Sequence, residues 1–146
     1  MIMLSMTLQV VHLQVTIFEE LITERGYPFE THSVKTEDNF ILTLFRIKSR
    51  IPDENQENRK EVVLLAPGLD ESADAWILNR ANNSLPFYLL EKGFDVWLLN
   101  NRGCSYSREH TEYHISHSKL WDFSFQEMAQ FDVPATLRFI TAHTGQ

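Results

Sequence analysis

The stretch that decides the fold is residues 61–103, EVVLLAPGLDESADAWILNRANNSLPFYLLEKGFDVWLLNNRG. It opens with the run Glu61–Pro67, which is continuously apolar and β-branched at its start, as is typical of a strand buried on both faces. A second strand pattern follows at Phe94–Asn100. Between the two, Ser84 is placed to cap a helix that Gly93 ends. The stretch therefore predicts a strand–helix–strand unit in a parallel sheet.

The residues before this unit predict a short helix and an antiparallel hairpin. A helical pattern over Thr16–Arg25 stops at Gly26, which a proline follows closely, a common combination at helix ends. From His32 to Ile47 the sequence contains two β-rich runs, THSVKT and NFILTLFRI, separated by the turn-forming residues 37–39. Residues 48–60 are polar and lack apolar periodicity, so they predict a surface loop within the domain.

The residues after the unit predict a further helical region, Asp122–His143. We expect this region to restart near Asp132 and Pro134, because proline fits the first turn of a helix but not its interior. The elements together predict an α/β fold, with an edge β-hairpin followed by a parallel β-α-β-α arrangement. The last helix should feed another central strand, so the sheet up to Gln146 is expected to be incomplete, with an open edge that favours self-association.

Length and composition favour one globular domain. The chain has 146 residues, of which 43% are hydrophobic and 23% charged, and this length is sufficient to bury a core. The 13 basic and 20 acidic residues give a formal net charge of −7, which argues against a nucleic acid partner. Cys104 is the only cysteine, so no internal disulfide and no cysteine-rich metal site are expected.

The N-terminal residues are less clearly patterned than the rest of the chain. We divide the chain into a weakly defined segment, residues 1–15, and a folded region, residues 16–146. The first segment is apolar, but no Lys or Arg precedes it and Gln9, His12 and Gln14 interrupt it. Two interpretations remain open, a cleaved signal peptide and a degraded or mis-started N-terminus, that is, a degraded signal or a start at Met1 that is not the true one. No integral membrane segment is expected.

Three segments carry a family resemblance: Glu24–Ile47, Pro67–His110 and Leu120–Gln146. They contain the elements GYP, TEDNFIL, NNSL, GFDVWL, NRG, LWDFSF, EMAQFD and VPATLRFI. In this combination they resemble the acid lipases, the gastric and lysosomal α/β-hydrolases that cleave triacylglycerols and cholesteryl esters. The resemblance is collinear over most of the chain and covers the N-terminal part of that fold. It implies a neutral lipid or ester substrate, a secreted or lysosomal location, and serine-ester chemistry without cofactor or metal.

The chemistry of such an enzyme needs residues that these 146 positions do not provide. The family uses a serine in a G-x-S-x-G turn, then a carboxylate, then a histidine. No two of the five glycines stand four residues apart, so the turn is absent here. The resemblance implies that nucleophile, acid and base lie beyond Gln146, and the chain alone is predicted to be inactive. A noncatalytic remnant or binding module that keeps only the half-sheet is the alternative.

The resemblance assigns one wall of the active site to this chain, in the loop after the first parallel strand. In the family, the backbone N–H after a His-Gly pair helps to stabilise the oxyanion, and the corresponding residue is Leu69. Here Pro67 replaces the family's histidine before Gly68. Trp76 aligns with a family aromatic and is a candidate substrate contact, with core packing as the alternative. Asn82 begins an Asn-Asn-Ser sequon and is a candidate glycosylation site.

Two loops are expected to form the functional edge of the sheet, and their other residues are interpreted as follows from their chemistry. In parallel sheets, ligands bind at the carboxyl ends of the strands, which places the loops beginning at Pro67 and Asn100 at the functional edge. In the second of these loops, Arg102 is expected to tie neighbouring loops together. Cys104 is a weak candidate nucleophile, because nothing around it marks it as reactive. We expect no metal site.

The strongest competing motif is a group of histidines with the spacing H-x3-H-x2-H. It consists of His110, His114 and His117, and histidine is a common zinc ligand. The spacing differs from the zincin motif, because Glu112 stands two residues after the first histidine instead of one. Solvated loop histidines are therefore the favoured interpretation.

Overall fold

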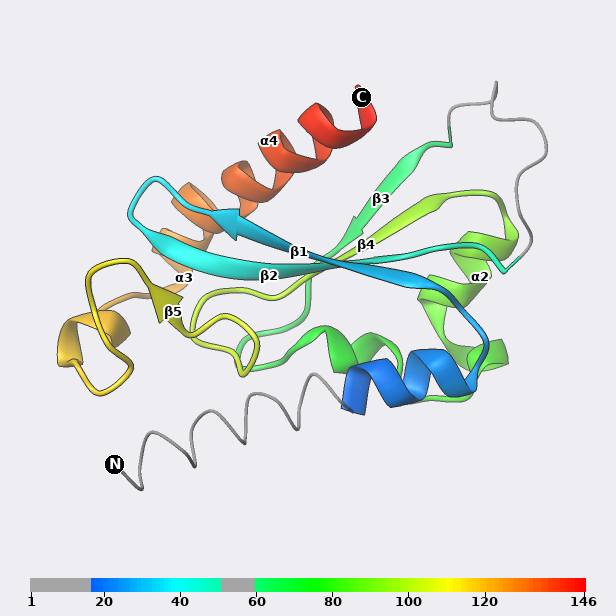
Figure 1. The fold of residues 1–146 in the computed structure, drawn as a ribbon, viewed down its shortest axis with the longest axis horizontal. Helices are drawn as coiled ribbons and strands as arrows, with labels where there is room; N and C mark the ends of the chain where they lie inside the picture. Colours follow the sequence, from blue (N-terminus) through cyan, green and yellow to red (C-terminus); the bar gives the residue numbers. More distant parts are fainter. Residues whose placement is uncertain (1–16, 51–59) are drawn as a thin grey trace.

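The computed structural model describes residues 17–50 and 60–146, which are built around a five-stranded sheet (Figure 1). The strand order is β1-β2-β4-β3, and β5 pairs with the beginning of β2. β1 and β2 form an antiparallel hairpin, whereas β3 and β4 run parallel. The predicted edge hairpin and the predicted parallel pair are thus confirmed. The strands are β1 Phe29–Lys35, β2 Phe40–Ile47, β3 Val62–Leu65, β4 Asp95–Leu99 and β5 Glu109–His110.

Helices cover both faces of this sheet. In Figure 1, α4 lies over one face, and α2 and the helix over residues 17–24 lie on the other side. The predicted α/β architecture is therefore confirmed. The α-helices with defined bounds are α2 Leu85–Glu91, α3 Phe125–Glu127 and α4 Val133–Thr144. The 3-10 helices are η1 Ala73–Trp76, η2 Ala81–Asn83 and η3 Ser118–Trp121, and η4 Met128–Asp132 is a π-helix.

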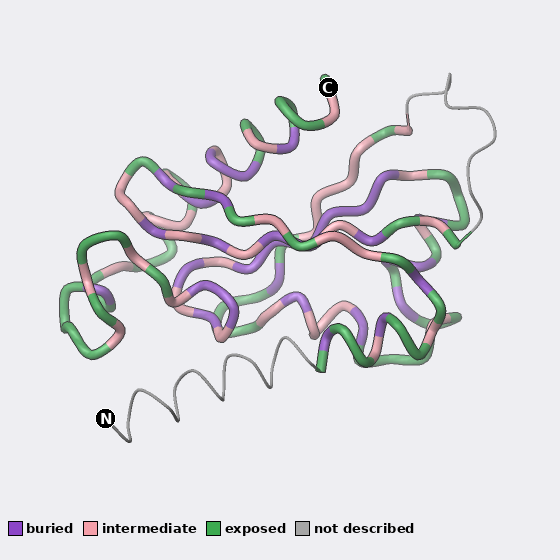
Figure 2. Tube along the Cα trace, in the orientation of Figure 1, coloured by how far each residue is buried: buried purple, intermediate pink, exposed green. Residues whose placement is uncertain are grey.

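Alternation along the central strands divides the core into two clusters. On β4, Val96 and Leu98 belong to the cluster that includes α2, whereas Trp97 and Leu99 belong to the cluster that includes α4. All four side chains are fully buried. Figure 2 shows the buried residues gathered along the middle of the sheet and on the inner sides of the helices. β4 is therefore covered on both faces, as expected for a central strand of an α/β sheet.

β3 departs from the prediction that it is buried on both faces. All of its residues, Val62–Leu65, are only half-buried, because β3 lies at one end of the strand order. Among the described residues, no strand pairs with the side of β3 that faces away from β4. An open strand edge offers unpaired backbone groups to another chain, so self-association through it stays a prediction.

The first helix ends where the sequence predicts. The N–H of Tyr27 donates to the carbonyl of Ile22 (3.2 Å), and the N–H of Gly26 donates to the carbonyl of Thr23 (2.8 Å). These two bonds form a Schellman motif, in which Gly26 adopts a φ of 72° that a side chain would disfavour. The motif turns the chain into β1.

α2 begins at the predicted position, but the predicted cap from the side chain of Ser84 is wrong. Ser84 occupies the N-cap position without giving a side-chain cap to the helix. Its hydroxyl instead donates to the carbonyls of Asn79 and Arg80, both at 3.0 Å. The buried hydroxyl is thus satisfied by the preceding turn, and it holds that turn against the start of α2.

The predicted restart of the last helical region takes the form of a π-helix. α3 continues into η4, and α4 then begins with Pro134 in its first turn. Proline has no N–H for the carbonyl one turn before it, and the wider π turn accommodates this missing bond. The same segment carries Asp132 into the interior, where it is fully buried.

Two predictions fall outside the described residues. They concern the N-terminal segment, residues 1–15, and positions 51–59 of the predicted surface loop. Within the part of the chain that the structure describes, no helix is both long and apolar enough to cross a bilayer.

A cluster of ion pairs joins β1, β2 and β4 on one face of the sheet. Glu30 lies opposite Arg46 in the β1–β2 register, and Arg46 also donates to both carboxylate oxygens of Asp95 (2.7 and 2.9 Å). Lys48 pairs with Glu30 at 2.5 Å. Partial burial opposes ionisation of Glu30, but hydrogen bonds and charge from Lys48 and Arg46 outweigh it and lower its pKa from 4.5 to about 2.

This cluster predicts a loss of stability in acid. Because the folded-state pKa of Glu30 lies below its unfolded value, its contribution is complete above pH 4.5 and disappears as the pH falls towards 2. Partial exposure of the side chain limits the effect to on the order of 1 kcal/mol. Urea unfolding at pH 5 and pH 3 should show a smaller pH dependence for Glu30→Gln than for the wild type. The exposed Glu91→Gln should keep the wild-type dependence; an unchanged dependence in Glu30→Gln would contradict the assignment.

Candidate functional site

The carboxyl ends of β3 and β4 open into a cavity of about 340 Å³. The two loops that the sequence places at this edge, those beginning at Pro67 and Asn100, both contribute to its walls, and residues 121–128 complete it. The lining residues are Gly68, Leu69, Asp70, Glu71, Asn101, Arg102, Gly103, Cys104, Trp121, Phe123, Ser124, Phe125 and Met128. The prediction that the two loops meet at one site is confirmed.

The first loop contains a backbone donor that has no acceptor among the described residues. The N–H of Glu71 donates to the Gly68 carbonyl (3.2 Å), while the Glu71 carboxylate accepts the N–H of Gly68 (3.0 Å). Asp70 has a φ of 60°, which reverses the chain directly after Leu69. No described residue accepts a hydrogen bond from the Leu69 N–H, and the Leu69 side chain is 69% exposed. The Leu69 N–H is therefore available to a ligand.

Asn100 fixes this loop relative to the sheet. Its side-chain oxygen accepts the N–H of Ala73 (2.9 Å), and its side-chain amide donates to the carbonyl of Thr43 on β2 (3.0 Å). Its own carbonyl accepts the hydroxyl of Ser107 (2.8 Å). One fully buried side chain thus joins the first loop, the second loop and β2. The sequence predicts only that Asn100 begins a turn. A polar residue directly after the apolar run 96–99 is the signal that it must find buried partners.

Arg102 holds the second loop to two distant segments, as its planar donors predict. The guanidinium is 1% exposed and donates to both oxygens of Asp38, at 2.6 and 2.9 Å. Its Nε donates to Asp132 (2.9 Å), and the Arg102 backbone N–H donates to the other oxygen of Asp132 (2.9 Å). The ring of Phe40 lies 4.2 Å from the guanidinium carbon. Burial opposes ionisation of Asp38, but the hydrogen bonds from Arg102 and Thr36 lower its pKa below the usual 3.8.

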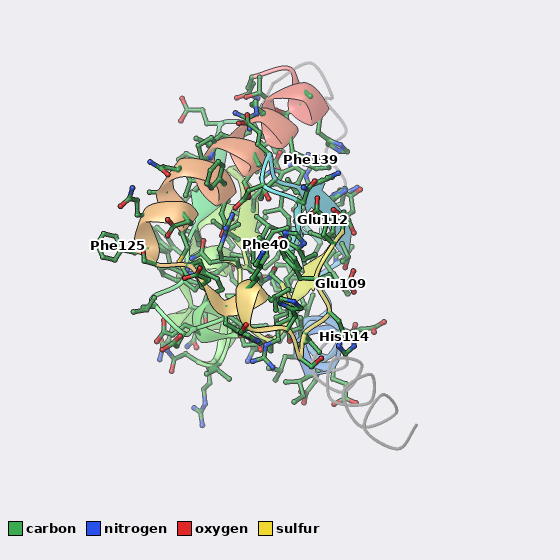
Figure 3. The ribbon with its side chains drawn as sticks, turned by 90° about the vertical axis from the view of Figure 1, so that its left-hand side faces the viewer. Phe40, Glu109, Glu112, His114, Phe125 and Phe139 are labelled. Carbon is green, nitrogen blue, oxygen red and sulfur yellow. The ribbon has the colours of Figure 1, made fainter. Side chains whose placement is uncertain are left out.

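Large apolar side chains surround the cavity. Leu69, Trp121 and Phe125 are 69%, 43% and 78% exposed. Figure 3 shows the ring of Phe125 pointing away from the body of the molecule. Exposed aromatic and aliphatic groups around one hollow form a surface suited to apolar ligands or to further protein.

Trp76 and Asn82 lie outside this cavity. Trp76 packs half-buried against the core cluster on the α2 side, and its buried indole N–H has no partner among the described residues. Its position shows that Trp76 packs in the core, and a contact between Trp76 and substrate stays a prediction. Asn82 lies in η2 with an exposed side chain, so the sequon is accessible, and its glycosylation also stays a prediction.

The histidines and the cysteine of the competing motifs do not converge. His110 accepts the N–H groups of Glu112 and Tyr113 at its Nδ1, and its Nε2 lies 2.9 Å from the carbonyl oxygen of Asp38. His110 is half-buried in β5, so the expectation of a solvated loop histidine is wrong for this residue, because β5 pairs with β2. His114 instead contacts Ser116 (2.9 Å). Burial raises the pKa of the Cys104 thiol, which disfavours the nucleophilic thiolate. These contacts assign local structural roles to the residues.

Comparison with known proteins finds similarity to lipases. Residues 18–80 match the family described as the partial α/β-hydrolase lipase region. Human lipase member M is 45% identical over 127 residues, which cover 87% of this chain and 30% of that protein. Human lysosomal acid lipase/cholesteryl ester hydrolase is 42% identical and rat gastric triacylglycerol lipase 44% identical, each over 87% of this chain and 32% of the relative. An esterase from Pyrococcus furiosus superposes with a TM-score of 0.53 at 17% identity, over 83% of this chain and 38% of that one.

The fold and these comparisons define the class: the described residues form the N-terminal part of an α/β-hydrolase. Within that class, the chain is similar to the gastric and lysosomal acid lipases. It spans 30–32% of the length of the three relatives named above.

Proposed function

We propose that this chain supplies the N-terminal part of a lipase-type carboxylic ester hydrolase, acting on triacylglycerols or cholesteryl esters. The observation that carries the proposal is the Leu69 N–H, which has no acceptor among the described residues and lies at the cavity beyond β3 and β4. This is the edge of an α/β sheet where ligands bind, and a backbone donor there suits a developing oxyanion. The relatives with lipase names support the choice of substrate class.

In the proposed reaction, this chain supplies the oxyanion donor, and residues outside these 146 positions supply the nucleophile and the base. A serine outside the 146 positions attacks the ester carbonyl, whose oxygen becomes an oxyanion, and a histidine base takes the serine proton. The Leu69 N–H donates to that oxyanion. Asn100 holds the loop in place through Ala73, and the exposed apolar side chains around the cavity face the acyl chain. Trp76 is a further proposed substrate contact.

The location and modification of the protein follow the same proposal. A secreted or lysosomal protein would expose Asn82 to the glycosylation machinery, and the side chain of Asn82 is exposed. The names of the gastric and lysosomal relatives support this location.

The proposal predicts that the 146-residue chain does not hydrolyse esters by itself. An oxyanion donor without nucleophile and base lacks most of the catalytic machinery. We expect nitrophenyl butyrate to be hydrolysed at the rate of a serine-free protein control of equal concentration. Steady turnover above that control would mean that the chain carries a nucleophile of its own.

Sequencing the native transcript across the codon for Gln146 tests the proposed function directly. We expect it to continue into a strand and a G-x-S-x-G turn, and its product to release fatty acid from triacylglycerol or cholesteryl ester emulsions. Replacement of the serine in that turn by alanine is the control. A confirmed stop codon after Gln146 would remove the lipase chemistry and leave the alternative, a binding module built on the half-sheet, which the absence of G-x-S-x-G from these residues favours.

A further inference from the structure

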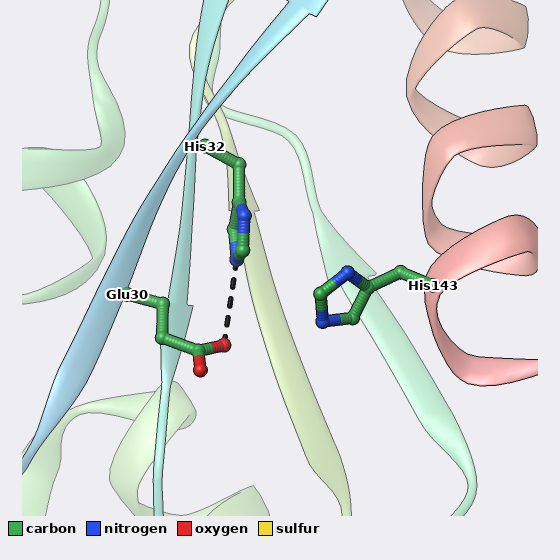
Figure 4. A group of neighbouring side chains, drawn as sticks. All are labelled: Glu30, His32 and His143. Carbon is green, nitrogen blue, oxygen red and sulfur yellow. Dashed lines mark hydrogen bonds and ion pairs between the residues drawn. The ribbon is translucent and has the colours of Figure 1, made fainter.

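A group of metal-binding side chains lies apart from the loop cavity. Glu30 and His32 stand two residues apart on β1, so their side chains leave the same face of the strand. α4 packs against this face, and its last turn brings His143 beside them. Figure 4 shows the three side chains converging from β1 and α4. One ligand atom from each lies within 4.8 Å of the other two, and none of the three residues lines the cavity beyond β3 and β4.

Aromatic packing orients the two imidazole rings. The His32 ring lies 5.2 Å from Trp97 and 5.3 Å from Phe139, measured between ring centroids. The His143 ring stacks on Phe139, one helical turn earlier on α4, and lies 5.0 Å from the His32 ring. His143 is exposed, and none of the described residues forms a hydrogen bond with its ring. The two rings are therefore held beside one another with solvent access.

Both oxygens of Glu30 contact neighbouring side chains, and Oε2 is the one that faces His32. Lys48 binds Oε1, and Oε2 lies 3.4 Å from Nε2 of His32 and 3.3 Å from Arg46. Asp95 binds Arg46 through both of its oxygens, so the guanidinium keeps a full partner if it releases Oε2. Glu30 and Asp95 together carry two negative charges, and Lys48 and Arg46 carry two positive charges, so this group of four is neutral before an ion binds.

We propose that Glu30, His32 and His143 form a binding site for a divalent transition-metal ion, with Zn²⁺ as the fitting example. Two imidazoles and one carboxylate are ligands that zinc binds at about 2.0–2.2 Å, with water in the fourth position. The ligand atoms move towards one another by rotation of the exposed His143. The bound ion joins the edge strand β1 to the end of α4, and this role is independent of the proposed ester hydrolysis.

Zinc titration of the purified, chelator-treated 146-residue chain tests this site. We expect dialysis and metal analysis to show one bound zinc ion per chain. This binding should require His143. Thermal unfolding should shift upwards by about 5–10 °C at a zinc concentration a hundredfold above the Kd. Mg²⁺ should give no shift, because it prefers oxygen ligands and retains its water.

Variants separate this site from the other histidines. His143→Ala should keep the metal-free Tm near the wild-type value, because the side chain is exposed, and should lose the zinc-dependent shift. Glu30→Gln should also lose the shift. His114→Ala, which removes an exposed histidine outside the site, should retain it. A shift of wild-type size in His143→Ala, or no shift in the wild type, overturns the proposal.

Discussion

Replacing Asp132 by alanine is expected to lower the free energy of unfolding by about 3–5 kcal/mol, the cost of breaking a buried ion pair by removing one partner. Asp132 is fully buried, and its carboxylate accepts hydrogen bonds from both the guanidinium and the backbone N–H of Arg102. Without it, Arg102 keeps Asp38 but loses the partner on its inner side, and a guanidinium that is 1% exposed has little access to water. Urea unfolding at neutral pH, followed by far-UV circular dichroism, measures the difference.

An exposed pair in the same chain is the matched control. Arg138 and Glu37 lie 2.9 Å apart, with side chains that are 57% and 69% exposed. Arg138→Ala should therefore cost less than about 1 kcal/mol. If Asp132→Ala costs no more than Arg138→Ala, then the Arg102 network does not hold the second loop, and its apparent role as an anchor is wrong.

The Arg102 network also shows what the sequence can and cannot predict. The planar donors of Arg102, placed in a turn after a strand, predict that it ties loops together. Its partners Asp38 and Asp132 are separated from it by 64 and 30 positions, and no local pattern links them. Asp38 is read from the sequence as a turn residue and Asp132 as a helix restart, and both descriptions are correct. Their shared contact depends on the tertiary fold.

The same limit applies to the strands and to the candidate sites. The sequence predicts two-sided burial for the run that contains β3, but β3 is half-buried. β4, predicted only as a strand, is buried along its whole length, because strand order and not composition decides which strand is central. The rule that ligands bind at strand ends places the Pro67 and Asn100 loops together without further information. No comparable rule predicts from the sequence that His143 lies beside His32, because β1 and α4 come into contact only when α4 packs on the folded sheet.

Replacing Leu69 by proline is expected to lower kcat about 10²–10³-fold in the longer protein that the proposed function requires, because it removes one oxyanion donor. Leu69→Ala is the matched variant: it keeps the backbone N–H and removes a side chain that is 69% exposed. We expect Leu69→Ala to retain kcat within a few-fold of the wild type. The comparison therefore isolates the N–H from the side chain.

The local structure allows this substitution to be interpreted as a loss of the donor. The Leu69 N–H has no acceptor among the described residues, so proline breaks no hydrogen bond in this part of the loop, and the preceding Gly68 keeps its bond to Glu71. An equal Tm for the two variants would show that the loop remains folded. A substrate contact made equally in the ground state would raise KM and leave kcat unchanged, whereas an oxyanion contact lowers kcat. Equal kcat values for Leu69→Pro and Leu69→Ala would place the oxyanion donor elsewhere in the protein.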